Sequence, residues 1–306
     1  MKDKQLEEKI DQLQAQVNSE GLDDFLGLSP SQMHLLMYGE FDEIEPILCF
    51  NYIFDRGLLA NVPVVNKVNL LIRLIGEVRE AKATQNGYLP KKIVNALYDS
   101  PFTDRPFTVA TEEYAPDILA LRYAVTDCGW LKKKNRKFSL TKKGQQILER
   151  GFAPEDYVTL LKYWLKKYNW SFTDSRPECS IVQQASIFSL YILCRKAKEL
   201  FPTAQFAQLF IKAFPMALEM LPEEKHLLKS AEESLADIIR LRFLDRFVSY
   251  FGLAEYVVDE SLPYLERNKK SQVKLSNLFS EVLCWFAPDK QQTKQIFDAA
   301  GNDFLH

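Results

Sequence analysis

The chain has 306 residues, of which 47% are hydrophobic and 26% are charged, the proportions of an ordinary soluble globular protein. The formal net charge of −2 excludes a surface that is basic all over, so any nucleic-acid contact would need a local patch. No apolar run reaches the roughly 18 residues of a membrane span, and the charged N-terminus is unlike a signal peptide, so we expect a cytoplasmic protein.

The first segment, residues 1–64, is predicted to be helical. Within residues 1–20 the apolar positions are spaced four, three and four apart, which places one stripe along a helix; they are Leu6, Ile10, Leu13 and Val17. Two heptads are too few for a stable isolated coiled coil, so we favour a helix packed on its own body. The alternative is that residues 1–20 pair with a second copy in a homodimer.

Helix-start chemistry follows the first stripe. Ser29 is a candidate N-cap and Pro30 sits at the first helical position, so a short helix through Tyr38 should follow. A further helix, apolar on nearly every face, is expected from about Asp42 to Phe54.

Residues 65–151 have the element order of a winged-helix domain, a form of helix-turn-helix. Helices are predicted at 68–82, 90–97 and 113–127. A hairpin comes next, because Trp130 and Leu131 are joined to Phe138 and Leu140 by a polar turn around Asn135. Thr141 then stands where the next helix would have its N-cap.

Residues 152–306 are predicted to be a helical domain. Helices are expected at 154–168, 181–201, 202–214, 275–286 and 290–299. A second winged-helix-like unit at about 227–286 is left open, because residues 117–123 (DILALRY) reappear as 237–243 (DIIRLRF) ahead of another glycine and another alternating run. The predicted fold class is therefore mainly α, a multi-helical body with one or two winged-helix units whose wings are short β-hairpins.

Several short motifs together resemble a family of uncharacterised bacterial proteins with a Gly-Leu-Ser-Pro-x-Gln-Met opening. They are Gly27 to His34, Gly87 to Lys92, Thr141 to Gly144, Tyr168 to Trp170, and Gln183 with Gln184. The resemblance implies no activity or binding residues that could be carried over. Separately, the wing segment is similar to those of many bacterial winged-helix regulators, and this similarity implies fold more than function.

Charge in the wing is the strongest functional observation. Seven of the twelve residues from 132 to 143 are basic and none is acidic: Lys132, Lys133, Lys134, Arg136, Lys137, Lys142 and Lys143. On a protruding hairpin such residues could bind phosphates, with an affinity that falls as salt rises. The helix that would enter the major groove carries mostly acids, however, with Arg122 as its cation. A solvated turn that keeps an edge strand from pairing is the alternative interpretation.

A smaller candidate polar site lies in the loop after residue 168, where Asp174, Arg176 and Glu178 could form a charged cluster. Capping and inter-helix ion pairs explain these residues at least as well. The five cysteines, Cys49, Cys128, Cys179, Cys194 and Cys284, are widely spaced and are expected to be reduced, buried thiols. With three histidines and no Cys-x-x-Cys pair, we predict no metal site, no cofactor and no catalytic residue.

The residues therefore predict a non-enzymatic binding protein that uses winged-helix surfaces to contact a protein partner. A DNA-binding regulator whose basic wing contacts phosphates is the alternative. An enzyme with its site in a helical cleft is a third hypothesis.

Overall fold

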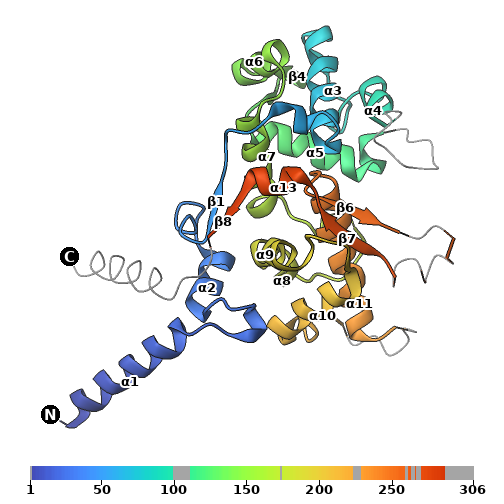
Figure 1. Cartoon of the computed structure of the whole chain (residues 1–306). Coiled ribbons are helices and arrows are strands. Elements are labelled where there is room, and N and C mark those ends of the chain that lie inside the picture. The colour runs from blue at the N-terminus through green and yellow to red at the C-terminus, as the bar shows by residue number, and fades with distance from the viewer. Residues whose placement is uncertain are drawn as a thin grey trace.

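The computed structural model describes residues 2–98, 111–172, 174–222, 229–258, 261–262, 266 and 270–286. It is mainly helical, with three small antiparallel sheets in the described residues (Figure 1). None of the described helices is long and apolar enough to cross a membrane.

The first sheet belongs to a unit of residues 63–150. In chain order its elements are α3 (Pro63–Val78), β2 (Ala81–Lys82), α4 (Lys91–Tyr98), α5 (Pro116–Asp127), β3 (Leu131–Lys134), β4 (Lys137–Leu140) and α6 (Lys142–Arg150). The strand order is β2-β4-β3, so the short strand after the first helix pairs with the last strand of the hairpin. The hairpin and the Thr141 N-cap predicted from the sequence are confirmed.

A second unit repeats this order. Its elements are α9 (Ser186–Lys196), β5 (Phe201–Pro202), α10 (Thr203–Ala213), α11 (Ala231–Ile239) with its π-helical continuation η5 (Arg240–Ser249), β6 (Ala254–Val257), β7 (Gln272–Leu275) and α13 (Asn277–Val282). The strand order is β5-β7-β6, which matches β2-β4-β3 position by position.

The two units also share the turn that leads into each hairpin. Gly129 and Gly252 both have positive φ, +78° and +67°, a conformation that glycine adopts without steric cost. The Thr141 hydroxyl donates to the Gly129 carbonyl over 2.6 Å, and the Ser276 hydroxyl donates to the Gly252 carbonyl over the same distance. Each hydroxyl also caps the helix that follows. The resemblance between the two segments therefore extends from sequence to hydrogen bonding.

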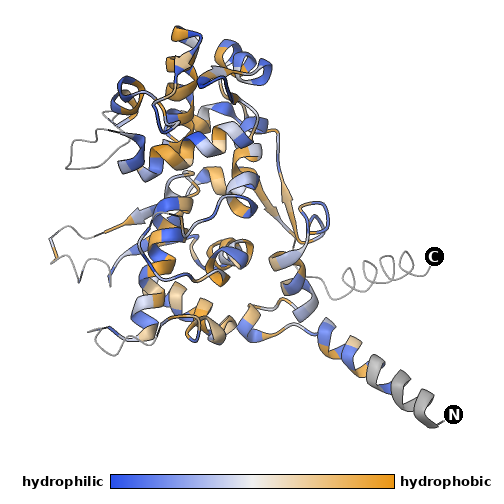
Figure 2. Cartoon of the chain, turned by 180° about the vertical axis from the view of Figure 1, so that it is seen from behind, coloured by the Kyte–Doolittle hydropathy of each residue, from blue (hydrophilic) through white to orange (hydrophobic). Residues whose placement is uncertain are grey.

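Helix α7 (Pro154–Lys166) lies between the two units (Figure 1). Tyr157 is fully buried, and Trp164 contacts the rings of Tyr250 and Phe251 at 5.9 and 5.5 Å. Toward the first unit α7 packs on α5, where the Tyr163 hydroxyl donates to Asp127 over 2.9 Å. Figure 2 shows hydrophobic residues along the inward sides of the helices, and in α9 every residue from 186 to 193 is buried. One continuous core thus contains both units and α7.

The N-terminal segment meets the C-terminal end of the described chain. Strand β1 (Leu48–Phe50) pairs antiparallel with β8 (Leu283–Trp285). Ahead of β1, α2 (Pro30–Tyr38) begins as the sequence predicts, with Ser29 and Gln32 forming a reciprocal capping box. Helix α1 (Lys2–Ser19) projects away from the body (Figure 1).

Four expectations about helices differ from the structure. The helix expected at 68–82 begins at Pro63 and ends at Val78, and residues 81–82 form β2. The helix expected from Asp42 is absent, because residues 48–50 form β1 and bury Leu48 and Phe50 against a strand from the far end of the chain. The helix expected at 181–201 is divided at Ala185 into α8 (Ile181–Gln184) and α9, and ends at Lys196. The helix expected at 275–286 shortens to α13, since β8 follows it directly. The helix expected at 290–299 lies outside the described residues.

Candidate functional site

The basic hairpin is held by a tight turn. Asn135 and Arg136 connect β3 to β4, and both have positive φ, +50° and +58°, as a type I′ turn requires. Its two-residue loop fixes the register, so Lys134 stands opposite Lys137 and Lys132 stands opposite Ser139.

Directly opposed residues of an antiparallel pair share one face of the sheet. Lys134 and Lys137 therefore lie on the same face, and Lys82 of β2 joins them because it is opposite Lys137 on the other side. With Lys132 these residues form what we call the basic face: Lys82, Lys132, Lys134 and Lys137, all exposed. Opposed like charges destabilise a sheet, and within the described residues Glu80, paired with Lys137, is the carboxylate that offsets this repulsion.

Two other cations of the hairpin are already engaged. Lys133 donates from Nζ to the Gly87 carbonyl over 2.8 Å, and Arg136 donates to the carbonyls of Thr84 and Gln85 over 3.2 and 3.1 Å. On the basic face itself, Lys137 forms a 2.6 Å ion pair with Glu80. In the described part of the chain, Lys82, Lys132 and Lys134 form no hydrogen bond or ion pair through their side chains. These three side chains of the basic face are therefore free to bind an anion.

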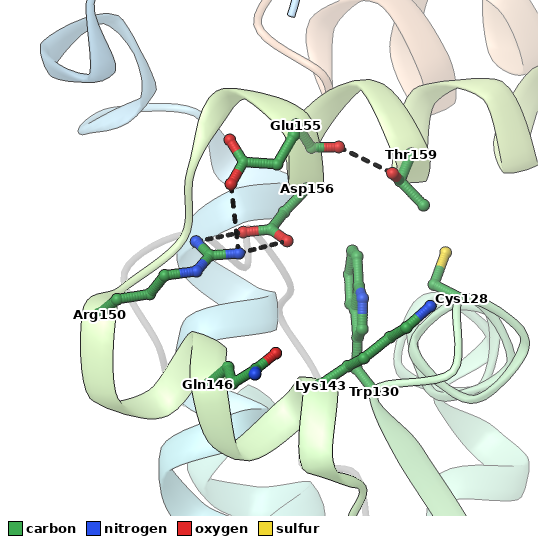
Figure 3. Close-up of a pocket in the computed structure, with 8 residues that line it drawn as sticks. All are labelled: Cys128, Trp130, Lys143, Gln146, Arg150, Glu155, Asp156 and Thr159. Carbon is green, nitrogen blue, oxygen red and sulfur yellow. Dashed lines mark hydrogen bonds and ion pairs between the residues drawn. The ribbon is translucent and has the colours of Figure 1, made fainter.

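Lys142 and Lys143 begin α6 and lie off the basic face. Both are exposed, and Lys143 extends toward Cys128 and Trp130 in a pocket of about 240 Å³ between α6 and α7 (Figure 3). Across this pocket Arg150 is paired with Asp156 over 2.8 Å. Burial is the main cause that raises the pKa of the Cys128 thiol to about 12, so this thiol stays protonated and is a poor nucleophile at neutral pH.

Little of α5, the helix expected from the sequence to enter a major groove, reaches the surface. Of its twelve residues only Tyr123 and Asp127 are exposed, and Asp127 accepts the hydrogen bond from Tyr163 of α7. Its cation, Arg122, is buried in an ion pair with Glu112, which also accepts from the Leu89 amide.

The structure does not bring together the three residues of the predicted polar site. Asp174 is buried and accepts from Nε and Nη2 of Arg242 over 2.6 and 3.2 Å, while Arg176 and Glu178 are exposed. Asp174 also accepts from the Arg176 amide over 2.9 Å, which fixes the loop. Through its ion pair with Arg242, Asp174 therefore holds this loop against η5.

A larger cleft, of about 480 Å³, opens between the end of α2, the loop after α7 and the helices α8 and α9. Gln183, on its wall, accepts from the Trp170 amide over 3.0 Å and donates to the Tyr168 carbonyl over 2.6 Å. Burial is the main cause that raises the pKa of Tyr168 to about 12. Among the described residues, no three His, Cys, Asp or Glu side chains are grouped so that they could hold a metal ion.

One member of the basic face was missed in the sequence. Lys82 lies fifty residues before the wing in an unremarkable run, and only the β2–β4 pairing brings it beside Lys137. A two-residue strand carries no alternation that could have revealed it.

Comparison with protein-family models, with curated proteins and with solved structures finds no match to this chain. The resemblance of its short motifs to a bacterial family therefore stays an interpretation of the sequence.

Proposed function

We propose that residues 63–150 and 186–282 are two winged-helix units, arranged in tandem around α7. Two observations support this proposal: the element order is the same in both, and so are the strand orders β2-β4-β3 and β5-β7-β6. In such a unit α5 would be the recognition helix of the first copy, and α11 with η5 that of the second.

From these units we infer a non-enzymatic binding protein that contacts a protein partner. The observation that carries this inference is the covering of α5 by α7, which leaves two exposed residues on a helix that would have to enter the major groove. The second unit is similar, because Phe243 and Phe247 of η5 are buried against Trp170. Without an accessible recognition helix, base edges cannot be read in the usual way.

The basic face is the surface that we assign to this contact. Acidic residues of a partner would relieve the repulsion among its opposed lysines, and the free Lys82, Lys132 and Lys134 would gain ion pairs. The second sheet offers no such face, since Lys274 of β7 is opposite Glu255 and is paired with Glu199 over 3.3 Å.

A second candidate function is sequence-independent binding of DNA phosphates. The free lysines of the basic face favour it, because an exposed basic hairpin can contact a duplex without a recognition helix.

The N-terminal helix supplies a further proposed contact, with a second copy of the chain. Leu13 and Val17 are 62% and 61% exposed, so the body does not cover this part of the stripe. In the heptad numbering of the sequence, Leu6 and Leu13 take d positions and Ile10 and Val17 take a positions, the pattern that favours parallel two-stranded coiled coils.

Titration against two fluorescent probes tests the proposed function. One probe is a random-sequence DNA duplex and the other a poly-glutamate peptide of similar charge, each followed by anisotropy at low and moderate salt. The variant changes Lys82, Lys132 and Lys134 to serine. The matched control changes three exposed lysines elsewhere, Lys196, Lys198 and Lys270, and so removes the same charge.

We expect the peptide to bind, with affinity lost in the variant and retained in the control. Salt-sensitive binding of the duplex, lost in the variant, would instead establish the second candidate. If neither probe binds at low salt, the basic face is not the contact surface.

A further inference from the structure

We propose that Cys49 and Cys284 are a redox modification site, at which exchange with a low-molecular-weight disulfide such as glutathione disulfide forms a reversible bond between β1 and β8. The site is independent of the proposed binding function.

Strand register carries this proposal. Cys49 stands directly opposite Cys284 in the antiparallel pair, flanked by Leu48 opposite Trp285 and Phe50 opposite Leu283. The backbone hydrogen bonds of Asn51 to Val282 and of Phe286 to Ile47 make this a hydrogen-bonded pair. Its Cα atoms are therefore about 5.5 Å apart, inside the range of about 4.4 to 6.8 Å found across disulfides. The Cβ atoms, about 5.5 Å apart in such a pair, must approach by about 1 Å for the two sulfur atoms to bond.

Both thiols lie on the accessible face of the β1–β8 ribbon. Leu48, Phe50 and Leu283 are buried, whereas both cysteines, on the opposite face, are part-exposed. They are also close enough to interact electrostatically, since Cys284 contributes to the raised pKa of Cys49, behind burial and Glu45.

Nearby charges act in opposite directions on Cys49, where Glu45 raises the pKa of the thiol and Lys162 lowers it by less. The Lys162 ammonium lies 4.8 Å from the ring centre of Phe50, the neighbour of Cys49, and acts against the rise in the pKa of the Cys49 thiol. A cation beside a thiol favours the thiolate, which is the attacking form.

The remaining cysteines are less suited to this chemistry. Burial raises the pKa of the Cys128 thiol to about 12, and Cys179 is 2% exposed. Cys194 is part-exposed on α9, where no strand register sets a second cysteine against it. Cys49 and Cys284 are the cysteine pair that a β-ladder aligns among the described residues.

The reaction is balanced as two thiol–disulfide exchanges. The Cys49 thiolate attacks one sulfur of glutathione disulfide, forms a mixed disulfide and releases one glutathione thiolate. The Cys284 thiolate then attacks the Cys49 sulfur and releases the second glutathione. The protein loses two protons and two electrons, and the glutathione disulfide is reduced to two glutathione molecules.

The bond would matter to the fold because the ribbon is short. Three residues on each side make a marginal two-stranded sheet, and a link from residue 49 to residue 284 closes a loop that contains most of the chain. Oxidation should therefore hold the N-terminal segment on the body.

The test equilibrates the full chain in glutathione buffers of graded potential and follows it by intact mass and peptide mapping. Comparison variants are Cys49→Ser, Cys284→Ser and, as a matched control, Cys194→Ser. We expect the wild type and Cys194→Ser to lose two hydrogens and to yield a linked Cys49–Cys284 peptide. Each of the other two variants should instead gain one glutathione at the remaining cysteine.

A thermal readout separates the bond from general thiol oxidation. The Tm of the oxidised wild type should rise by at least about 4 °C and return on reduction with dithiothreitol, with no such rise for Cys49→Ser. The proposal is overturned if the wild type accumulates only glutathione adducts, or if the linked peptide joins another pair.

Discussion

The hydroxyl of Tyr157, in the helix between the two units, donates a 2.6 Å hydrogen bond to the backbone carbonyl of Phe251, just before the turn glycine of the second unit. Tyr157 is fully buried, and its ring also contacts that of Phe251 at 6.0 Å. A residue of α7 thus fixes the point at which η5 turns toward its hairpin. The α7 helix therefore positions the second unit as well as covering α5 of the first.

Changing Tyr157 to Phe should destabilise the protein by about 1 to 3 kcal/mol, because it leaves a buried carbonyl without its donor. Urea unfolding followed by circular dichroism measures the loss. Tyr163→Phe is the matched control, since Tyr163 bonds to the exposed carboxylate of Asp127 and should cost less. Equal losses of unfolding free energy in the two variants would show that the hydrogen bond to the Phe251 carbonyl contributes no more than the one to Asp127.

The buried pair of Asp174 and Arg242 is expected to be sensitive to removal of one partner. Their side chains are 0% and 1% exposed, so Asp174→Asn leaves the Arg242 charge buried without its counterion and should cost about 3 to 5 kcal/mol. The neighbouring Arg176→Ala, at an exposed position, should change stability by less than about 0.5 kcal/mol. A small effect of Asp174→Asn in the same unfolding assay would contradict this account.

Asp245 should make stability depend on pH. Burial is the main cause that raises its pKa from 3.8 to about 6, against the lowering effect of Arg240, which is 2.8 Å away. The folded protein therefore holds this proton more tightly than the unfolded chain, and its contribution to stability falls as pH rises from about 4 to about 6. At 1.36 kcal/mol per unit, the limit is about 3 kcal/mol.

Asp245→Asn isolates that contribution from those of other carboxylates. As pH rises from 4 to 6, the wild type should lose up to about 3 kcal/mol of unfolding free energy relative to the variant. A pH-independent difference would show that Asp245 titrates normally.

Pairing of α1 between two copies predicts a mass near that of a dimer. Changing Leu13 and Val17 to serine should shift the population toward monomer in light scattering after size-exclusion chromatography, because both side chains belong to the stripe. Gln12→Ser, at another exposed position of the same helix, should leave the mass unchanged. A wild type that is monomeric at high concentration would rule out the pairing.

Local chemistry explains which elements could be predicted. Ser29 and Pro30 mark the start of α2 by a capping pattern that needs no distant partner, and the 131–140 hairpin has its turn between its two strands. Strand β1 could not be found in this way, because the apolar run around Leu48 fits a helix as well as a strand until β8 pairs with it.

The same distinction between local patterns and distant contacts applies to the candidate site. The wing lysines are visible in the sequence, but the roles of individual residues are set by tertiary contacts. The strand register places the side chain of Lys133 on the opposite face from Lys132 and Lys134, where it donates to Gly87. Lys82 belongs to the basic face because β2 pairs with β4. Likewise, Asp174 and Arg122 look available for binding in the sequence, but the structure holds each of them in a buried ion pair.

The pairing of β1 with β8 also orders events during synthesis. Leu48 and Phe50 leave the ribosome early, whereas the strand that covers them follows after both helical units have been made. Strand β1 must therefore wait without its partner until the body is nearly built, and its pairing with β8 is one of the last steps of folding. A chain truncated before residue 283 would leave β1 without the strand that pairs with it.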